Sequence, residues 1–169
     1  MPLDDPTALV RAAQGGDTLA MHELLDRLAP YVARICGPIA LASAPDAAQE
    51  TLIQVFKQLR RLREPATLYA WVRTIAVREA IRAARTDRRA LPMAPPDLAE
   101  LPARDDPQLV ADVRDVLTKL RPEQRAVLVL RDLEGMDERT AAAMLRVPTG
   151  TVKSRLHRAR ESFREAWNR

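Results

Sequence analysis

Hydroxyl and basic side chains gather near the start of the last predicted helix, which begins at Thr149. Apolar residues recur on one side of this helix, from Val152 to Phe163, and must pack on the rest of the protein. Such hydroxyl and cationic side chains bind phosphates and guanine edges, and small residues allow close approach. The pattern predicts a helix that binds the DNA major groove, and the alternative is a solvated basic face. Gly150, Thr151, Ser154, His157 and Arg158 then face outward, and Lys153, Arg155 and Arg160 lie on the flanks. The predicted DNA-binding residues are Thr149, Gly150, Thr151, Lys153, Ser154, Arg155, His157 and Arg158.

The segment before this helix contains the elements that position a DNA-reading helix. An apolar helix is predicted after Arg121, followed by a break at Gly135. Asp137 can cap an alanine-rich helix that runs from Thr140 to Leu145. A short turn at 146–148 then leads into the last helix. This order is typical of a helix-turn-helix domain.

A second group of cationic side chains lies in an earlier predicted helix and in the loop before it. The helix begins near Thr67, and its apolar face includes Trp71. We expect Trp71 to be a core residue, and the alternative is a platform on which a base stacks. The loop RRLREPAT, residues 60–67, is charged, and such loops are usually solvated. The arginines that can neutralise phosphates are Arg60, Arg61, Arg63, Arg73, Arg78, Arg82 and Arg85.

The N-terminal part of the chain is also predicted to be helical. A short helix over 7–13 ends at a pair of glycines, and Asp17 or Thr18 can cap the next helix. Pro30 is expected to force a restart or a kink in that helix, and Gly37-Pro38 to end or bend it, because proline lacks the amide hydrogen. Ser43 is then expected to cap a helix that runs to Leu59. Its predicted apolar face consists of Leu52, Val55, Phe56 and Leu59, and its predicted polar face includes Asp46, Gln49, Glu50 and Gln54.

A change of composition divides the chain. Between residues 90 and 107 there are five prolines and four acidic residues, with no helical or strand period. We predict an all-α protein with two small helical domains, residues 1–88 and 107–169, joined by an acidic, proline-rich linker at 89–106. Asp106 and Pro107 are expected to begin the second domain, whose first helix has the apolar stripe Leu109, Val113, Val116, Leu117 and Leu120.

The totals exclude several classes of protein. The chain has 169 residues, a net charge of +4 and one cysteine, Cys36, so it has neither an internal disulfide nor a zinc site built on several thiolates. We expect Cys36 to be a small buried residue, and the alternative is a redox role. The two histidines have no paired acidic motif and there is no glycine-rich phosphate loop, so we predict no enzyme activity, no cofactor and no metal. No apolar run approaches the length of a membrane span and the start is unlike a signal peptide, which predicts a cytoplasmic protein with no membrane insertion.

Two motifs resemble those of one family. The run GTVKSRLHRAR at 150–160 looks like the promoter-binding fourth region of bacterial extracytoplasmic-function (ECF) sigma factors. Asp46, Gln49, Glu50 and Thr51 are similar to the helix of the second region that binds RNA polymerase. The set Trp71, Ile75, Ala76 and Arg85 resembles the helix that melts the promoter. The two motifs occur in the family's order and cover nearly the whole chain.

The resemblance implies a promoter-specificity subunit. It implies that the predicted DNA-binding residues of the last helix bind the minus-35 element of promoter DNA, and that the arginines at 60–85 with Trp71 bind the minus-10 element. It also implies that Asp46, Gln49, Glu50 and Gln54 bind core RNA polymerase, and the alternative is an ordinary solvated helix face. The linker is implied to run inside the polymerase, the alternative being a passive spacer, and an anti-sigma factor is implied as a partner.

The sequence also departs from the family pattern. Arg78 and Arg82 stand where the family commonly has Asn and Asp, and Arg146 replaces the usual turn glycine. A one-component regulator, with the same DNA-binding domain and an N-terminal dimerisation or ligand domain, is the main alternative. A third class, a protein that binds only another protein, would not need the arginine-rich helices.

Overall fold

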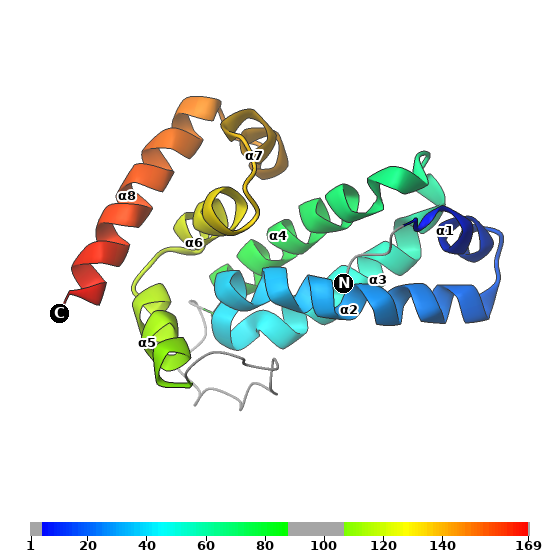
Figure 1. Cartoon of the computed structure of the whole chain (residues 1–169), viewed down its shortest axis with the longest axis horizontal. Helices are drawn as coiled ribbons and strands as arrows, with labels where there is room; N and C mark the ends of the chain where they lie inside the picture. The colour runs from blue at the N-terminus through cyan, green and yellow to red at the C-terminus, as the bar shows by residue number, and fades with distance from the viewer. Residues whose placement is uncertain (1–4, 88–106, 169) are drawn as a thin grey trace.

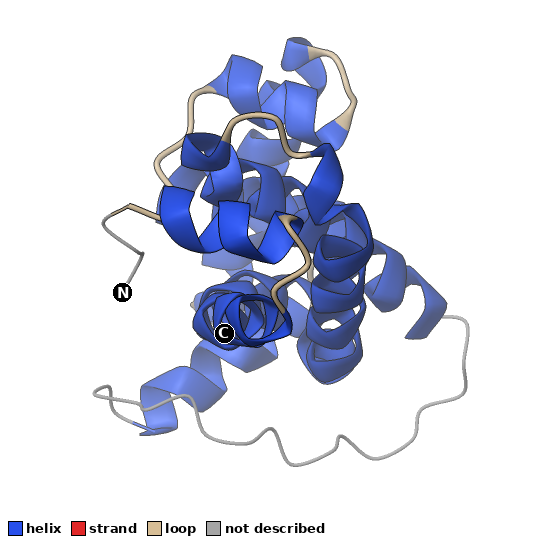
Figure 2. Ribbon diagram, turned by 90° about the vertical axis from the view of Figure 1, so that its right-hand side faces the viewer, coloured by secondary structure: helices blue, strands red, loops and turns tan. Residues whose placement is uncertain are grey.

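The computed structural model describes residues 5–87 and 107–168. All the elements in these two ranges are helices (Figure 2). The predicted linker at 89–106 and the predicted cap Asp106 lie outside the described residues, so the domain boundaries stay predictions. None of the described helices combines the length and the apolar character that crossing a bilayer requires.

Four helices form the N-terminal bundle: α1 (Thr7–Gln14), α2 (Thr18–Ala40), α3 (Ala44–Gln58) and α4 (Leu68–Asp87). The last three lie side by side, and α1 crosses the end of the bundle (Figure 1). Asp17 caps α2 as predicted, because its carboxylate accepts hydrogen bonds from the amides of Leu19 and Ala20. The side chains of Leu24, Leu28 and Ile35 are fully buried between the helices.

The predicted restart of α2 at Pro30 was wrong, whereas the end predicted at Pro38 is close, since the helix ends at Ala40. The helix continues through both prolines from Thr18 to Ala40. Pro30 is exposed, as is Asp26, the residue whose carbonyl loses its usual intrahelical donor. Water can reach that carbonyl, while the buried stripe continues without interruption on the opposite side of the helix. Burial of this stripe outweighs the missing hydrogen bonds.

Two predictions about α3 also need correction. Ser43 precedes the helix but its hydroxyl makes no capping hydrogen bond. Phe56 is 57% exposed, whereas Thr51 is fully buried. The helix is rotated so that small residues pack at the centre of the bundle. The Thr51 hydroxyl can be buried because it donates a 2.7 Å hydrogen bond to the carbonyl of Ala47.

The C-terminal bundle has the predicted helix-turn-helix order. It consists of α5 (Pro107–Thr118), α6 (Pro122–Leu128), a π-helical turn (Val129–Leu133), α7 (Glu138–Leu145) and α8 (Thr149–Trp167). Gly135 has a φ of +63°, which fits the predicted break, and Asp137 accepts a hydrogen bond from the amide of Thr140 as the predicted cap. The stripe predicted for α5 is buried at Val116 and Leu120, but Leu109 at its start is 46% exposed.

The two bundles pack against each other. Helix α6 contacts α2 and α4, and α7 contacts α4 (Figure 1). Buried residues of the C-terminal bundle, including Val127, Leu130 and Met144, belong to the same apolar core as α2 and α4. A continuous core of this kind holds the bundles in one closed arrangement.

Candidate nucleic-acid interface

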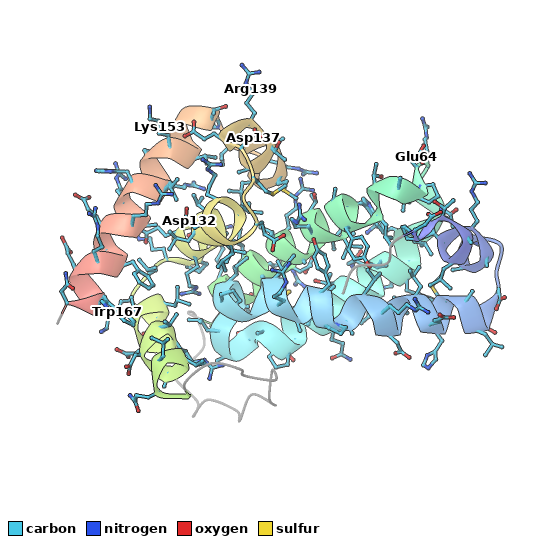
Figure 3. All side chains as sticks on the ribbon, viewed as in Figure 1. Glu64, Asp132, Asp137, Arg139, Lys153 and Trp167 are labelled. Atoms are coloured by element: carbon cyan, nitrogen blue, oxygen red, sulfur yellow. The ribbon has the colours of Figure 1, made fainter. Side chains whose placement is uncertain are left out.

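Helix α8 divides into a buried apolar side and an exposed polar side. Val152, Leu156 and Ala159 are buried against the preceding helices. On the other side, Thr149, Gly150, Lys153, Ser154, His157 and Arg158 are exposed. Figure 3 shows Lys153 pointing away from the rest of the molecule. Six of the eight predicted residues therefore share a free surface.

Thr151 and Arg155 are the other two predicted residues, and both are half-buried. Arg155 lines a cleft between α8 and α4, together with Arg146 of the turn. Arg146 has a φ of +54°, a left-handed conformation that non-glycine residues rarely adopt. Arg146 of the turn and Arg155 of α8 thus both face the N-terminal bundle.

The loop at 60–67 is more ordered than its composition indicates. It forms two short 3-10 turns, Leu59–Arg61 and Pro65–Thr67. The side-chain amide of Gln14 donates hydrogen bonds to the carbonyls of Leu59 at 2.9 Å and Leu62 at 2.7 Å. Sequence reasoning did not identify Gln14, because nothing in its neighbourhood signals a contact with a loop 45 residues away. The predicted side chains Arg60, Arg61 and Arg63 are exposed on this anchored loop.

Three of the four predicted arginines of α4 bind the C-terminal bundle. Arg73 forms an ion pair with Glu134 at 2.9 Å, and Arg85 pairs with Glu123 at 2.6 Å. Arg78 donates a 3.0 Å hydrogen bond to the carbonyl of Met144. Burial, followed by the positive charge of Arg146, holds the pKa of Arg78 below its ordinary value. The fourth, Arg82, pairs with Glu79 of the same helix.

Glu134 is the most buried carboxylate at the contact between the bundles. Its side chain is 5% exposed and bridges two arginines of the N-terminal bundle, Arg34 at 2.7 Å and Arg73 at 2.9 Å. Both guanidinium groups also lie near the ring of Tyr31, whose hydroxyl accepts a 2.8 Å hydrogen bond from Arg73. Burial raises the pKa of this phenol despite the neighbouring positive charge. We call these four residues the latch cluster.

A buried arginine makes a further contact between the bundles. Arg125 of α6 is 4% exposed and donates a 2.7 Å hydrogen bond to the carbonyl of Ile39 in the last turn of α2. It also donates to the carbonyls of Leu120 at 2.8 Å and Leu117 at 3.2 Å. Carbonyls at a helix end lack intrahelical donors, so a cation is favourable there. Sequence reasoning did not identify this role, because Arg125 ends a polar stretch that begins at Glu123, just before the apolar run 126–130.

Comparisons with known proteins match both bundles. The family model "Sigma-70 region 2" matches residues 21–90 and "Sigma-70, region 4" matches residues 111–163. The ECF RNA polymerase sigma factor SigE of Mycolicibacterium smegmatis is 33% identical over 180 residues, covering 97% of this chain and 69% of that protein. This chain belongs to the ECF sigma factor family. The ECF RNA polymerase sigma-E factor of Escherichia coli (strain K12) is 28% identical over 172 residues, covering 92% and 90% of the two chains.

Solved structures have the same fold as this sigma factor. CnrH, in complex with the cytosolic domain of CnrY, has a TM-score of 0.64 at 23% identity, covering 95% of this chain and 96% of that one. RpoE from Bartonella quintana, in complex with the anti-sigma factor NepR, has the same TM-score and identity, covering 87% and 96%.

Family membership establishes the general function. The chain is a promoter-specificity factor, and the one-component regulator is not favoured. Sigma factors are transcription initiation factors.

The predicted polymerase-binding residues lie on the outer part of α3. Asp46 and Gln49 are exposed, and Glu50 and Gln54 are half-buried. The side-chain amide of Gln54 donates a 2.7 Å hydrogen bond to Glu50, and that of Gln58 donates to Gln54. Such i,i+4 contacts hold the polar groups in a row along the helix. Among the described residues, α3 makes its main contacts with α2, α4 and the short turns around it, so the contact between the bundles does not use this face of the sigma factor.

Trp71 and Cys36 both pack in the N-terminal bundle. Trp71 is half-buried against the apolar core, as expected of a core residue. Cys36 is fully buried near Thr51 and Ala76, and burial raises the pKa of its thiol to about 12. Within the described ranges, no group of His, Cys, Asp or Glu side chains is arranged to hold a metal ion.

Proposed function

We propose that α8 of this sigma factor binds the minus-35 element through its exposed face. The observation that carries the proposal is the division of α8, whose residues Val152, Leu156 and Ala159 are buried in packing while its cationic and hydroxyl side is exposed. Gly150 supports the same role. A Cβ atom at this position would meet no atom within 4 Å, so the fold does not require glycine there. Close approach of the helix start to a phosphate or a base does favour glycine.

The minus-10 element is proposed to bind α4 and the loop before it. Arg60, Arg61 and Arg63 are exposed on a loop that Gln14 holds in place, which suits capture of an opened strand. The α4 arginines add positive charge next to it. Core RNA polymerase is proposed to bind the α3 face described above. The protein needs no cofactor or catalytic group for these tasks and works in the cytoplasm, where the polymerase is.

The closed arrangement is proposed to be inactive. Arg73, Arg78 and Arg85 bind the C-terminal bundle, which packs on α4 and keeps a DNA backbone away from them. The two promoter elements are also about 25 base pairs apart, or about 85 Å at a rise of about 3.4 Å per base pair. Two bundles that share a core cannot span that distance. Initiation therefore requires the bundles to separate.

An anti-sigma factor is the proposed partner of the closed form. The two solved structures of the same fold each contain a second protein. CnrH is in complex with the cytosolic domain of CnrY, and RpoE is in complex with the anti-sigma factor NepR. A partner that binds both bundles at once would stabilise the closed arrangement by its binding free energy.

Run-off transcription tests the proposed function. Core RNA polymerase with this protein is expected to initiate at defined start sites that core polymerase alone does not use. Arg155→Ala and Arg158→Ala should weaken protection of the minus-35 element while binding to core polymerase is kept. The proposal fails if the protein instead binds duplex DNA tightly as a free dimer and leaves the start sites of the polymerase unchanged.

A further inference from the structure

A cleft between the two bundles concentrates positive charge. It has a volume of about 440 Å³ and lies between α4, the turn after α7 and the start of α8. Five arginines line it, three from α4 and two from the C-terminal bundle: Arg78, Arg82, Arg85, Arg146 and Arg155. Of the described residues that line the cleft, only Glu123 has a carboxylate. We call this site the arginine cleft.

The carboxylates nearby do not balance these charges. Burial acts to raise the pKa of Glu123, but a backbone hydrogen bond, the 2.6 Å hydrogen bond from Arg85 and the charge of Arg155 together lower it. Glu79, outside the cleft, pairs with Arg82. Among the described residues, these two carboxylates leave the five arginines with an excess of three positive charges. No carboxylate of the described residues forms an ion pair with Arg78 or with Arg146. After burial, the positive charge of Arg146 is the second cause of the lowered pKa of Arg78.

The size and lining of the arginine cleft indicate the class of ligand. A volume of this order fits a small molecule and not a double helix. Guanidinium groups bind phosphate oxygens by paired hydrogen bonds, and several around one cavity suit an anion with several charges. The apolar side chains of Ile81 and Val147 line the same cleft and offer a surface for an organic ring.

We propose that the arginine cleft binds a small molecule that carries a chain of phosphates, either a nucleoside polyphosphate or an inorganic oligophosphate. The ligand contacts both bundles at once, so it binds the closed arrangement and not the open one. By linkage, it raises the closed population and withholds the α4 arginines from DNA. This regulatory effect rests on the proposed function, whereas binding itself does not.

Arg146 allows a substitution that spares the fold. Its left-handed φ of +54° is a conformation that glycine adopts without strain, so Arg146→Gly removes the guanidinium and keeps the turn. Arg139→Ala is the matched control because it removes one positive charge from α7 of the same bundle. Arg139 is exposed, does not line the cleft, and points outward in Figure 3.

Calorimetry on the full chain in magnesium-free buffer tests binding. Tripolyphosphate and ATP are each expected to bind the unaltered protein with one site, and adenosine is expected not to bind. Arg146→Gly should weaken binding by about tenfold or more, which corresponds to about 1.4 kcal/mol, and Arg139→Ala should leave it unchanged. Tighter binding of ATP than of tripolyphosphate would identify the ligand as a nucleoside polyphosphate. Equal binding of the two would show that the site recognises the phosphate chain alone.

Two results would overturn the proposal. One is the absence of saturable binding by both phosphate compounds. The other is equal loss of binding in Arg146→Gly and Arg139→Ala, which would indicate attraction to the overall charge. A fluorescence measurement of the distance between the bundles tests the regulatory effect separately from binding. Tripolyphosphate should increase the closed population only when Arg146 is present. Failure of run-off transcription would refute the proposed function and leave the binding result standing.

Discussion

Substitution of Glu134 by glutamine removes a charge from the contact between the bundles and keeps the size of the side chain. The carboxylate of Glu134 is 5% exposed and pairs with two arginines of the N-terminal bundle. Glutamine has the same size and keeps one carbonyl oxygen as an acceptor, but it carries no charge. Glu134→Gln therefore removes the negative charge at the centre of the latch cluster and preserves its packing.

The expected effect follows from the exposure of the two partners. Breaking a buried ion pair costs about 3–5 kcal/mol, whereas an exposed pair contributes about 0–1 kcal/mol. Arg73 is 20% exposed and Arg34 is 54% exposed, so one pair is partly buried and the other is screened by water. Because glutamine retains one acceptor, we expect the free energy that favours the closed form to fall by about 2 kcal/mol. The ratio of closed to open protein then falls about 30-fold.

Half-maximal run-off transcription measures this shift. If only the rare open form is active, the apparent affinity of the protein for core polymerase and promoter is proportional to the open fraction. Glu134→Gln is then expected to lower the protein concentration needed for half-maximal initiation, by up to about 30-fold. Asp132→Asn is the matched control, because Asp132 pairs with Arg160 inside the C-terminal bundle. An unchanged midpoint for Glu134→Gln, or equal shifts in the two variants, would refute the latch.

Three further predictions concern separate parts of the protein. Gly150→Ala should raise thermal stability by up to about 0.5 kcal/mol, since alanine is a better helix former, and yet weaken protection of the minus-35 element in footprinting. Arg125→Met should destabilise the protein by about 3 kcal/mol in urea unfolding, because the carbonyls that Arg125 binds, including that of Ile39, lose a buried donor. Cys36 should react with a thiolate-specific reagent at pH 8 far more slowly in the folded than in the unfolded protein, because its raised pKa of about 12 leaves almost no thiolate.

Helical periodicity was enough to predict most of the fold. The buried residues of α8 and the capping residues Asp17 and Asp137 follow from patterns within a few turns of chain, where side-chain spacing determines the face. Pro30 misled the prediction, because local rules count the lost hydrogen bond and cannot weigh it against burial along a long helix. Phe56 misled it too, since its spacing from Leu52 and Leu59 fits an apolar helix face, and yet the helix is rotated so that Phe56 is exposed.

The contact between the bundles could not be predicted from the sequence. Arg73 and Arg85 have the composition of a phosphate-binding helix, and only the folded chain shows that they pair with Glu134 and Glu123. These partners are separated by more than 35 residues, and no local period relates them. The sequence therefore predicts which side chains are suited to bind DNA, and the structure adds that several of them are occupied in the closed form.

The distance between the bundles tests most directly whether this sigma factor is closed when free and opens to initiate. Fluorophores can be attached at Glu64 and Arg139, which are exposed on different bundles and project to the same side in Figure 3. We predict efficient energy transfer in the free protein and a large loss of transfer when core polymerase and promoter DNA are added. Weak transfer in the free protein, or efficient transfer in a complex that initiates transcription, would contradict this prediction.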